Sequence, residues 1–185
     1  APNTGIPTTG GAFFDSSKMS YLTASANSNF QISSSESFTI AWWQYSTDTI
    51  DWPRIFSFGS GATLMAVSQE GGTFYLWRSG IWSSTSFTQK SDFANNWVHY
   101  AIVRNASTLR VYEDGIQKLS VSNSAAFGNG TSPFYIGTNL ENPDNQSRVN
   151  YGGYITGFEY IKGNAKYSGT NTTEQNFQPA TTLAG

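Results

Sequence analysis

Residues 97–121 read WVHYAIVRNASTLRVYEDGIQKLSV, and they predict a buried strand followed by a β-hairpin. Trp97–Arg104 is apolar at both sets of alternating positions, which is typical of a strand in the middle of a layered structure. Asp114 and Gly115 separate the next two strand-like runs. A type I′ hairpin turn favours this pair because both of its central residues adopt positive φ.

Short alternating runs bounded by Gly, Asn, Ser and Asp recur along the rest of the chain, without helical periodicity. In residues 36–45, ESFTIAWWQY, the side chains of Phe38, Ile40 and Trp42 alternate with those of Trp43 and Tyr45. Further strands are expected at Arg54–Phe58, Thr63–Ser68, Thr73–Arg78, Phe134–Gly137 and Gly153–Ile161. Roughly ten or more short strands predict an all-β, two-sheet antiparallel β-sandwich of the jelly-roll type.

The length of 185 residues fits one domain, and no linker or shift in composition divides the chain. We expect an extended lead-in over residues 1–11 and a single sandwich domain over residues 12–185.

Charged residues make up 12% of the sequence, about half of the usual ~25%, and the formal net charge is −2. The sequence has no run of Lys or Arg, which argues against nucleic acid and anionic membranes as partners. Every apolar stretch is shorter than the ~18 residues of a spanning helix, so no membrane insertion is expected.

Several segments form an ordered set that spans about Ala12 to Tyr167: AFFDSSKMSYL, SFTIAWWQY, NNWVHYAIVRNASTLRVYEDGIQ, PFYIGTN and GGYITGFEYIKGNAKY. This set resembles the laminin-G-like modules of the concanavalin A-like family. In this comparison AFFDSSKMSYL corresponds to the opening strand pair. The resemblance implies the concanavalin A-like version of the β-sandwich.

The C-terminal region resembles a closing motif common in laminin-G-like modules of phage and other viral particle proteins and of large bacterial surface proteins. The motif residues are Ile161–Gly163, Ala165, Tyr167, Phe177 and Pro179. The spacing between Tyr167 and Phe177 is longer than usual, which leaves the path of this segment open. The resemblance implies an adhesion module on a virion or in an extracellular, cell-surface location.

Catalysis is not expected from the pattern of titratable residues. Hydrolases of this fold carry alternating carboxylates on one strand, whereas Glu113 and Asp114 are adjacent, so we expect them to point apart in a hairpin turn. YIKGNAKY, residues 160–167, has a faint likeness to a lyase strand, but the other lyase motifs are missing. The one histidine, His99, lies where the family carries a structural histidine, and the chain has no cysteine.

The resemblance also implies where calcium would bind in related modules. The second half of that site is well supplied, with Glu141, Asn142, Asp144 and Asn145 offering oxygen ligands. The first half corresponds to Gly59–Thr63, which has no carboxylate. We therefore predict no cofactor and no metal ligands.

Aromatic and planar polar side chains gather in loops, a mixture that suits a sugar because rings stack on its CH face and polar groups bond its hydroxyls. Trp52 and Trp82 are less easily explained as core residues than Trp42, Trp43 and Trp97, although either indole has the alternative of capping the sandwich. The predicted ligand-binding residues are Asp48, Asp51, Trp52, Arg78, Trp82, Asn139, Asn142, Asp144, Arg148 and Tyr151.

Three functions are compatible with the sequence. The favoured one is a non-enzymatic adhesion module that binds a neutral glycan or a host surface receptor. The alternative is a structural capsid, fibre or decoration protein whose aromatic patches contact other copies of the chain or a larger viral assembly. A glycan-cleaving enzyme is the third, and it requires a titratable cluster in a groove that the sequence does not indicate.

Overall fold

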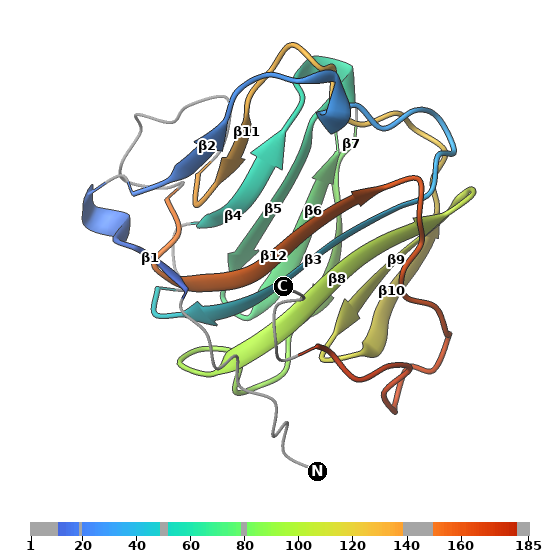
Figure 1. The fold of residues 1–185 in the computed structure, drawn as a ribbon. Coiled ribbons are helices and arrows are strands. Elements are labelled where there is room, and N and C mark those ends of the chain that lie inside the picture. Colours follow the sequence, from blue (N-terminus) through green and yellow to red (C-terminus); the bar gives the residue numbers. More distant parts are fainter. Residues whose placement is uncertain (1–10, 19, 49–51, 79–80, 139–149, 181–185) are drawn as a thin grey trace.

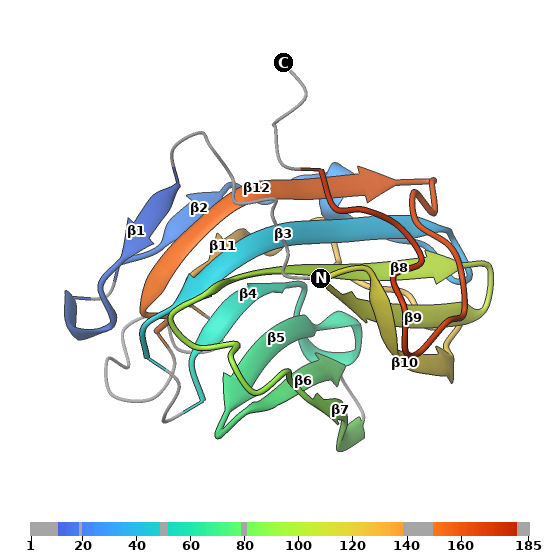
Figure 2. The same ribbon diagram turned by 90° about the horizontal axis from the view of Figure 1, so that it is seen from below.

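Two six-stranded antiparallel sheets pack face to face in the computed structural model, which describes residues 11–18, 20–48, 52–78, 81–138 and 150–180. The first sheet has the order β1-β12-β3-β8-β9-β10 and the second the order β2-β11-β4-β5-β6-β7. The first sheet lies in front in Figure 1, and Figure 2 shows the two layers from below. The described residues contain no α-helix. The predicted all-β sandwich is confirmed.

The strands of the first sheet are short at its edge and long at its centre. They are β1 (Ala12–Phe14), β12 (Gly153–Lys162), β3 (Phe38–Ser46), β8 (Trp97–Asn105), β9 (Thr108–Glu113) and β10 (Ile116–Ser122). Those of the second sheet are β2 (Leu22–Ala24), β11 (Phe134–Ile136), β4 (Arg54–Phe58), β5 (Met65–Glu70), β6 (Thr73–Arg78) and β7 (Ile81–Thr88). Short 3-10 turns cover Ser16–Lys18, Ser28–Phe30 and Gly61–Thr63.

The core lies between the sheets and is rich in aromatic rings. Trp42 on β3 is fully buried, and its ring stacks with Tyr100 of its own sheet at 5.7 Å between centroids. It meets Phe56 of the second sheet edge-on at 5.3 Å. Strand alternation sends Trp42 inward and its neighbour Trp43 to the outer face of the first sheet.

Most predicted strands match the observed ones within two residues, and the differences have local causes. At Asp114 and Gly115 φ is 49° and 80°, which confirms the hairpin. The expected strand Thr63–Ser68 begins later, at Met65, because a 3-10 turn ends at Thr63. β1 and β2 were expected as a pair, but β1 pairs with β12 and β2 with β11, so they belong to opposite sheets.

β7 is a strand that the sequence did not predict. Ile81–Thr88 pairs with β6 at the edge of the second sheet. Register shifts between Leu76 and Arg78, so the hairpin is irregular beside residues 79 and 80.

The C-terminal segment covers much of the outer face of the first sheet. Tyr167 and Phe177 stack with 4.0 Å between ring centroids and 11° between planes, so the longer spacing between them loops out and returns. The loop attaches to the β9–β10 turn: the Asn176 backbone N–H donates to the Gly115 carbonyl at 2.8 Å. Further along, the Trp43 indole N–H donates to the carbonyl of Ala180.

His99 is enclosed beneath this segment. Its ring contacts Trp43 at 5.3 Å, Tyr167 at 6.0 Å and Phe177 at 6.1 Å between centroids, and 4% of the residue is exposed. Burial, with a smaller contribution from the Lys166 charge, lowers the pKa of His99 to about 3. His99 is therefore neutral in the folded protein near pH 7, as its predicted structural role requires.

This burial predicts an acid-sensitive fold. The pKa of His99 is about 3 when folded against a model value of 6.5, so below pH 6.5 the unfolded chain takes up a proton that the folded chain does not. The free energy of unfolding should fall by up to about 1.4 kcal/mol per pH unit between these values from this residue. Urea unfolding at pH 7.5, 5.5 and 4.5 measures it.

A His99→Phe variant is the control, because its ring packs in the same place without titrating. Its free energy of unfolding should depend less on pH than that of the wild-type protein. Equal pH dependence of the two proteins would contradict the assignment.

Candidate functional site

A cluster of aromatic rings lies on the outer face of the second sheet, where it does not form part of the core. Trp52, which precedes β4, has its ring centroid 4.6 Å from Tyr75 and 5.6 Å from Trp77. Tyr75 and Trp77 stand 6.0 Å apart on β6, and the Arg54 guanidinium lies 5.2 Å from the Trp77 ring centre. We call these four residues the Trp52 cluster. Each of them is half-buried, between the core and full exposure.

Small side chains on the neighbouring strand make room for these rings. Across from Trp77 and Tyr75 on β5 are Ala66 and Ser68, both buried although they are on the outward positions of their strand. The Trp77 indole N–H reaches across to the Ser68 hydroxyl at 2.6 Å. This hydrogen bond fixes the direction of the indole across the sheet.

Trp52 has an unusual backbone conformation. Its φ is 60°, in the left-handed region that bulky residues avoid because the Cβ crowds the backbone. Such strain costs on the order of 1–3 kcal/mol and persists where the surrounding structure enforces it, often at binding sites. The conformation places the indole against Tyr75 and Trp77.

The segment that carries Trp52 lies beside the segment that begins at Asn150. The backbone N–H of Thr47 donates to the Gly152 carbonyl at 3.0 Å, and a Cβ on Gly152 would approach that of Asp48 at 2.8 Å. Arg54 forms a β-bridge with Asn150. These two segments, far apart in the sequence, therefore share one rim of the sandwich.

A buried polar network anchors this rim to the core. The Trp42 indole N–H donates to Gln44 at 2.7 Å, and the Gln44 amide donates to Gln69 at 2.8 Å. The Gln69 amide donates in turn to the backbone carbonyl of Asp48 at 3.4 Å. Because Gln44 belongs to β3 of the first sheet and Gln69 to β5 of the second, these hydrogen bonds cross between the two sheets and couple core packing to the position of the rim.

Tyr151 corrects the sequence prediction for that residue. It was expected to present its ring to a ligand, but it is fully buried, meets Phe14 at 6.0 Å between centroids and contacts the Ser46 hydroxyl at 3.2 Å. Burial raises the pKa of its phenol. A ring enclosed in the core has no face for a sugar, and the polar composition of the surrounding loop does not reveal this.

Of the other predicted binding residues, some lie at the shared rim and others lie outside the described part of the structure. Asp48 and Trp52 lie at the shared rim. Arg78 and Trp82 lie on β6 and β7, with side chains outside the described part of the structure. The predicted residues outside the described ranges are Asp51, Asn139, Asn142, Asp144 and Arg148. Tyr75 and Trp77 were not predicted, although alternation in TFYLWR sets both on the face opposite Phe74 and Leu76.

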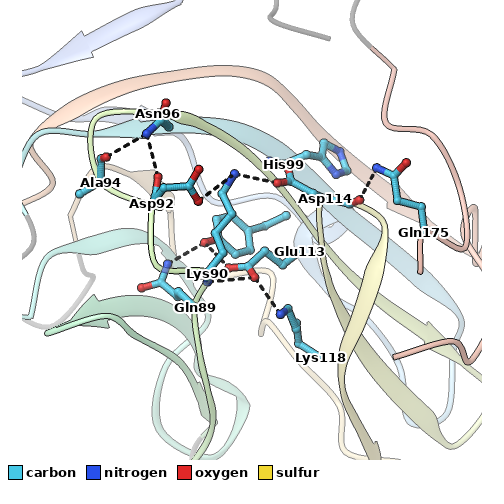
Figure 3. Close-up of polar contacts among 11 residues, drawn as sticks. Gln89, Lys90, Asp92, Ala94, Asn96, His99, Glu113, Asp114, Lys118 and Gln175 are labelled. Carbon is cyan, nitrogen blue, oxygen red and sulfur yellow. Dashed lines mark hydrogen bonds and ion pairs between the residues drawn. The ribbon is translucent and has the colours of Figure 1, made fainter. Parts of the chain in front are cut away.

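Glu113 and Asp114 contact different ends of Lys90, as Figure 3 shows: Glu113 accepts from its backbone N–H and Asp114 from its ammonium group. Glu113 is buried and accepts from the Lys90 backbone N–H, the Tyr100 hydroxyl and the Lys118 ammonium. Asp114 accepts from the Lys90 ammonium at 2.9 Å and from the His99 backbone N–H. Both carboxylates are engaged in tying the hairpin to the preceding loop.

Within the described ranges, no three His, Cys, Asp or Glu side chains gather as metal ligands would. The predicted calcium-type ligands Glu141, Asn142, Asp144 and Asn145 lie outside those ranges. A search of the same described residues for a helix long and apolar enough to cross a membrane finds none.

The sequence of residues 16–159 matches the family model described as the concanavalin A-like lectin/glucanases superfamily. The chain belongs to this superfamily. The resemblance inferred from the ordered motifs is confirmed. A comparison with curated proteins found no match.

Solved structures of related shape share the fold at low sequence identity. The mouse laminin α1 chain, domains LG4-5, matches with a TM-score of 0.62 and 12% identity over 81% of this chain and 40% of that one. The botulinum neurotoxin serotype G binding domain matches with a TM-score of 0.62 and 17% identity over 86% and 42%. This chain thus spans about two fifths of either relative.

A third match is domain 4 of AbnA, an extracellular arabinanase from Geobacillus stearothermophilus, solved in complex with arabinotriose. The TM-score is 0.52 and the identity 18%, over 71% of this chain and 63% of that one. At these identities the likeness establishes the fold.

The buried network generates a stability prediction. Gln44→Leu should lower the free energy of unfolding by about 2–4 kcal/mol, because it leaves the Trp42 indole N–H and the Gln69 side-chain oxygen buried without partners. Urea unfolding measures the change.

Gln117→Leu is the matched control, since Gln117 is buried and its side-chain oxygen has no hydrogen-bond partner in the described structure. It should cost less than Gln44→Leu. Equal costs for the two variants would show that the network does not stabilise the rim.

Proposed function

We propose that this domain is a non-catalytic carbohydrate-binding module whose Trp52 cluster stacks against the CH face of a sugar. The observation that carries the proposal is the convergence of three half-exposed rings, 4.6–6.0 Å apart, on an outer face of the sandwich. The Arg54 guanidinium lies beside the Trp77 ring, with its Nε and Nη1 atoms buried. Rings with polar groups beside them are what recognition of a sugar needs.

The low charge of the chain favours an uncharged ligand. With 12% charged residues and a net charge of −2, the surface has little long-range field to attract an anionic or cationic partner. Stacking and hydrogen bonds then supply the affinity. A neutral glycan, free or attached to a host receptor, fits these conditions.

The site chemistry supports binding without catalysis. The one histidine is buried and neutral, with its pKa lowered to about 3, and it lies under the C-terminal segment. Glu113 and Asp114 are held by Lys90 and Lys118. His99, Glu113 and Asp114 therefore do not face the Trp52 cluster, where an acid or base would have to lie to act on a glycosidic bond.

Two solved structures with this fold support a binding role. An arabinanase domain with this fold was solved with arabinotriose, and a neurotoxin binding domain shares the fold. The likeness of the closing motif to modules of viral particles and bacterial surface proteins extends the proposal to display on a virion or cell surface.

Trp52→Ala tests the site. An array of neutral and sialylated glycans that includes arabinotriose first identifies a glycan that the wild-type protein binds. The affinity of the Trp52→Ala variant for that glycan should be lower by about tenfold or more. The reason is that a lost stacking ring is worth at least about 1.4 kcal/mol. Isothermal titration calorimetry with that glycan measures the change, and circular dichroism checks folding.

Tyr21→Ala is the control, because Tyr21 is an exposed ring that contacts Tyr135 and lies outside the cluster. It should bind as the wild type does. An array without any bound glycan would refute the proposal. The proposal would also be refuted if the wild-type protein forms a stable oligomer and Trp52→Ala abolishes that assembly but not glycan binding. A structural particle protein predicts this outcome.

A further inference from the structure

A row of aromatic rings crosses the outer face of the other sheet. Phe13 on β1, Tyr154 on β12, Tyr45 on β3 and Trp97 on β8 are direct partners across four adjacent strands. Successive ring centroids are 4.9, 6.1 and 5.7 Å apart. We call these four residues the aromatic row.

The row is exposed, and the core does not account for it. Phe13 is 57% exposed and Tyr154 41%, while Tyr45 and Trp97 are partly exposed. Neighbouring residues on the same strands fill the core instead: Phe14, Val98 and Ile155 are buried between the sheets. Exposing large rings that the fold does not need is typical of an interaction surface.

The row is a narrow strip. Along the strands on one side, the next outward residues Trp43 and His99 are covered by the C-terminal segment. On the other side the strands end, where the Asn95 N–H bonds to Ser46 and the Thr47 N–H to Gly152. The accessible strip is therefore one residue deep and three strand spacings long, roughly 14 Å.

The flanks of the strip are polar and nearly uncharged. Two residues along the chain from each ring stand Gly11, Asp15, Trp43, Thr47, Asn95, His99, Gly152 and Thr156, of which Asp15 is charged, and Asp48 lies close to Gly152. Asp15 is 3.3 Å from the Lys18 ammonium. Within the row, Tyr45, Tyr154 and Trp97 combine an apolar ring with a polar O–H or N–H.

We propose that the aromatic row is a second carbohydrate-binding surface, which takes a linear, uncharged glycan laid across the four strands. The spacing of the rings is close to the length of one pyranose unit, so successive sugars meet successive rings. The phenol hydroxyls and the indole N–H are suited to the sugar hydroxyls. The absence of charged side chains in the row suits a ligand without charge.

Other occupants fit the strip less well. A protein interface uses about 20–30 residues per partner, more than a strip one residue deep supplies. A polyproline II helix repeats about every 9 Å, so it would meet only every second ring.

The proposal goes beyond the Trp52 cluster because the two surfaces lie on opposite faces of the sandwich. One molecule can then hold two glycan chains, or two stretches of one chain. Linked sites raise apparent affinity for a repetitive polysaccharide without a new contact at either site.

The experiment compares Phe13→Ala/Tyr154→Ala, Trp52→Ala, the combination of both, and Tyr21→Ala as an exposed-ring control. Native affinity electrophoresis in gels containing hydroxyethyl cellulose, arabinan or galactomannan measures retardation by each polysaccharide. Because Phe13 and Tyr154 are exposed, their replacement should leave the fold intact, which circular dichroism checks.

The row variant should bind at least one retarding polysaccharide about tenfold more weakly than wild type, and the combined variant should not be retarded. The oligosaccharide that corresponds to the retarding polysaccharide, which is cellohexaose, arabinohexaose or mannohexaose, is then added to 15N-labelled protein. It should shift the NMR signal of the Trp97 indole N–H in the wild-type protein and not in the row variant.

Three results would overturn the proposal. The first is equal retardation of wild type and row variant by every polysaccharide. The second is a decaproline peptide that shifts the Trp97 signal when none of the oligosaccharides does. The third is a wild-type dimer in sedimentation that only the row variant loses. If Trp52→Ala leaves binding unchanged while the row variant loses it, the proposal for the Trp52 cluster fails and that for the aromatic row stands. If no polysaccharide retards the wild-type protein, both proposals fail.

Discussion

Trp42 packs between the two sheets and so couples the fold to the rim that carries the candidate site. Its ring contacts Tyr100 in one layer and Phe56 and Phe74 in the other. Because an indole buried among rings still needs a partner for its N–H, Gln44 must be buried with it. Gln44 in turn requires Gln69, and Gln69 holds the backbone at Asp48. A hydrophobic requirement at the centre thereby determines where a surface loop begins.

The outer faces follow a second constraint, that of side-chain size. On the second sheet, Ala66 and Ser68 are small enough for the rings of β6 to lie over the adjacent strand. On the first sheet, the C-terminal segment covers Trp43 and His99 but leaves the next outward position along the strands open. Each face therefore presents rings in a defined area. The edge strands β1 and β2 are only three residues long, which limits their use as templates for aggregation.

The sequence predicts those parts of the molecule that depend on local patterns. Alternation identified β4 and β6, and Asp114 with Gly115 identified the hairpin, because turn geometry and strand periodicity involve neighbouring residues. The aromatic row could not be found this way, since it depends on the register among β1, β12, β3 and β8. Trp52 was found as an indole in a loop, but its partners on β6 come from a later hairpin. Tyr151 was misplaced because the same loop composition suits a buried ring and an exposed one.

Stacking and hydrogen bonding also determine how such a surface would act. Interactions between exposed charges weaken as salt is added, whereas contacts of rings with CH groups change little. A surface with few charges gains little electrostatic steering, so encounters with a ligand would occur without long-range attraction. Each ring cluster is small, and its contact with a sugar would be modest taken alone. Two faces, or several copies of the module on one particle, would compensate by avidity, since a second binding event within a tethered complex takes place at high effective concentration. Low charge and exposed rings are thus consistent with binding that relies on stacking and hydrogen bonds.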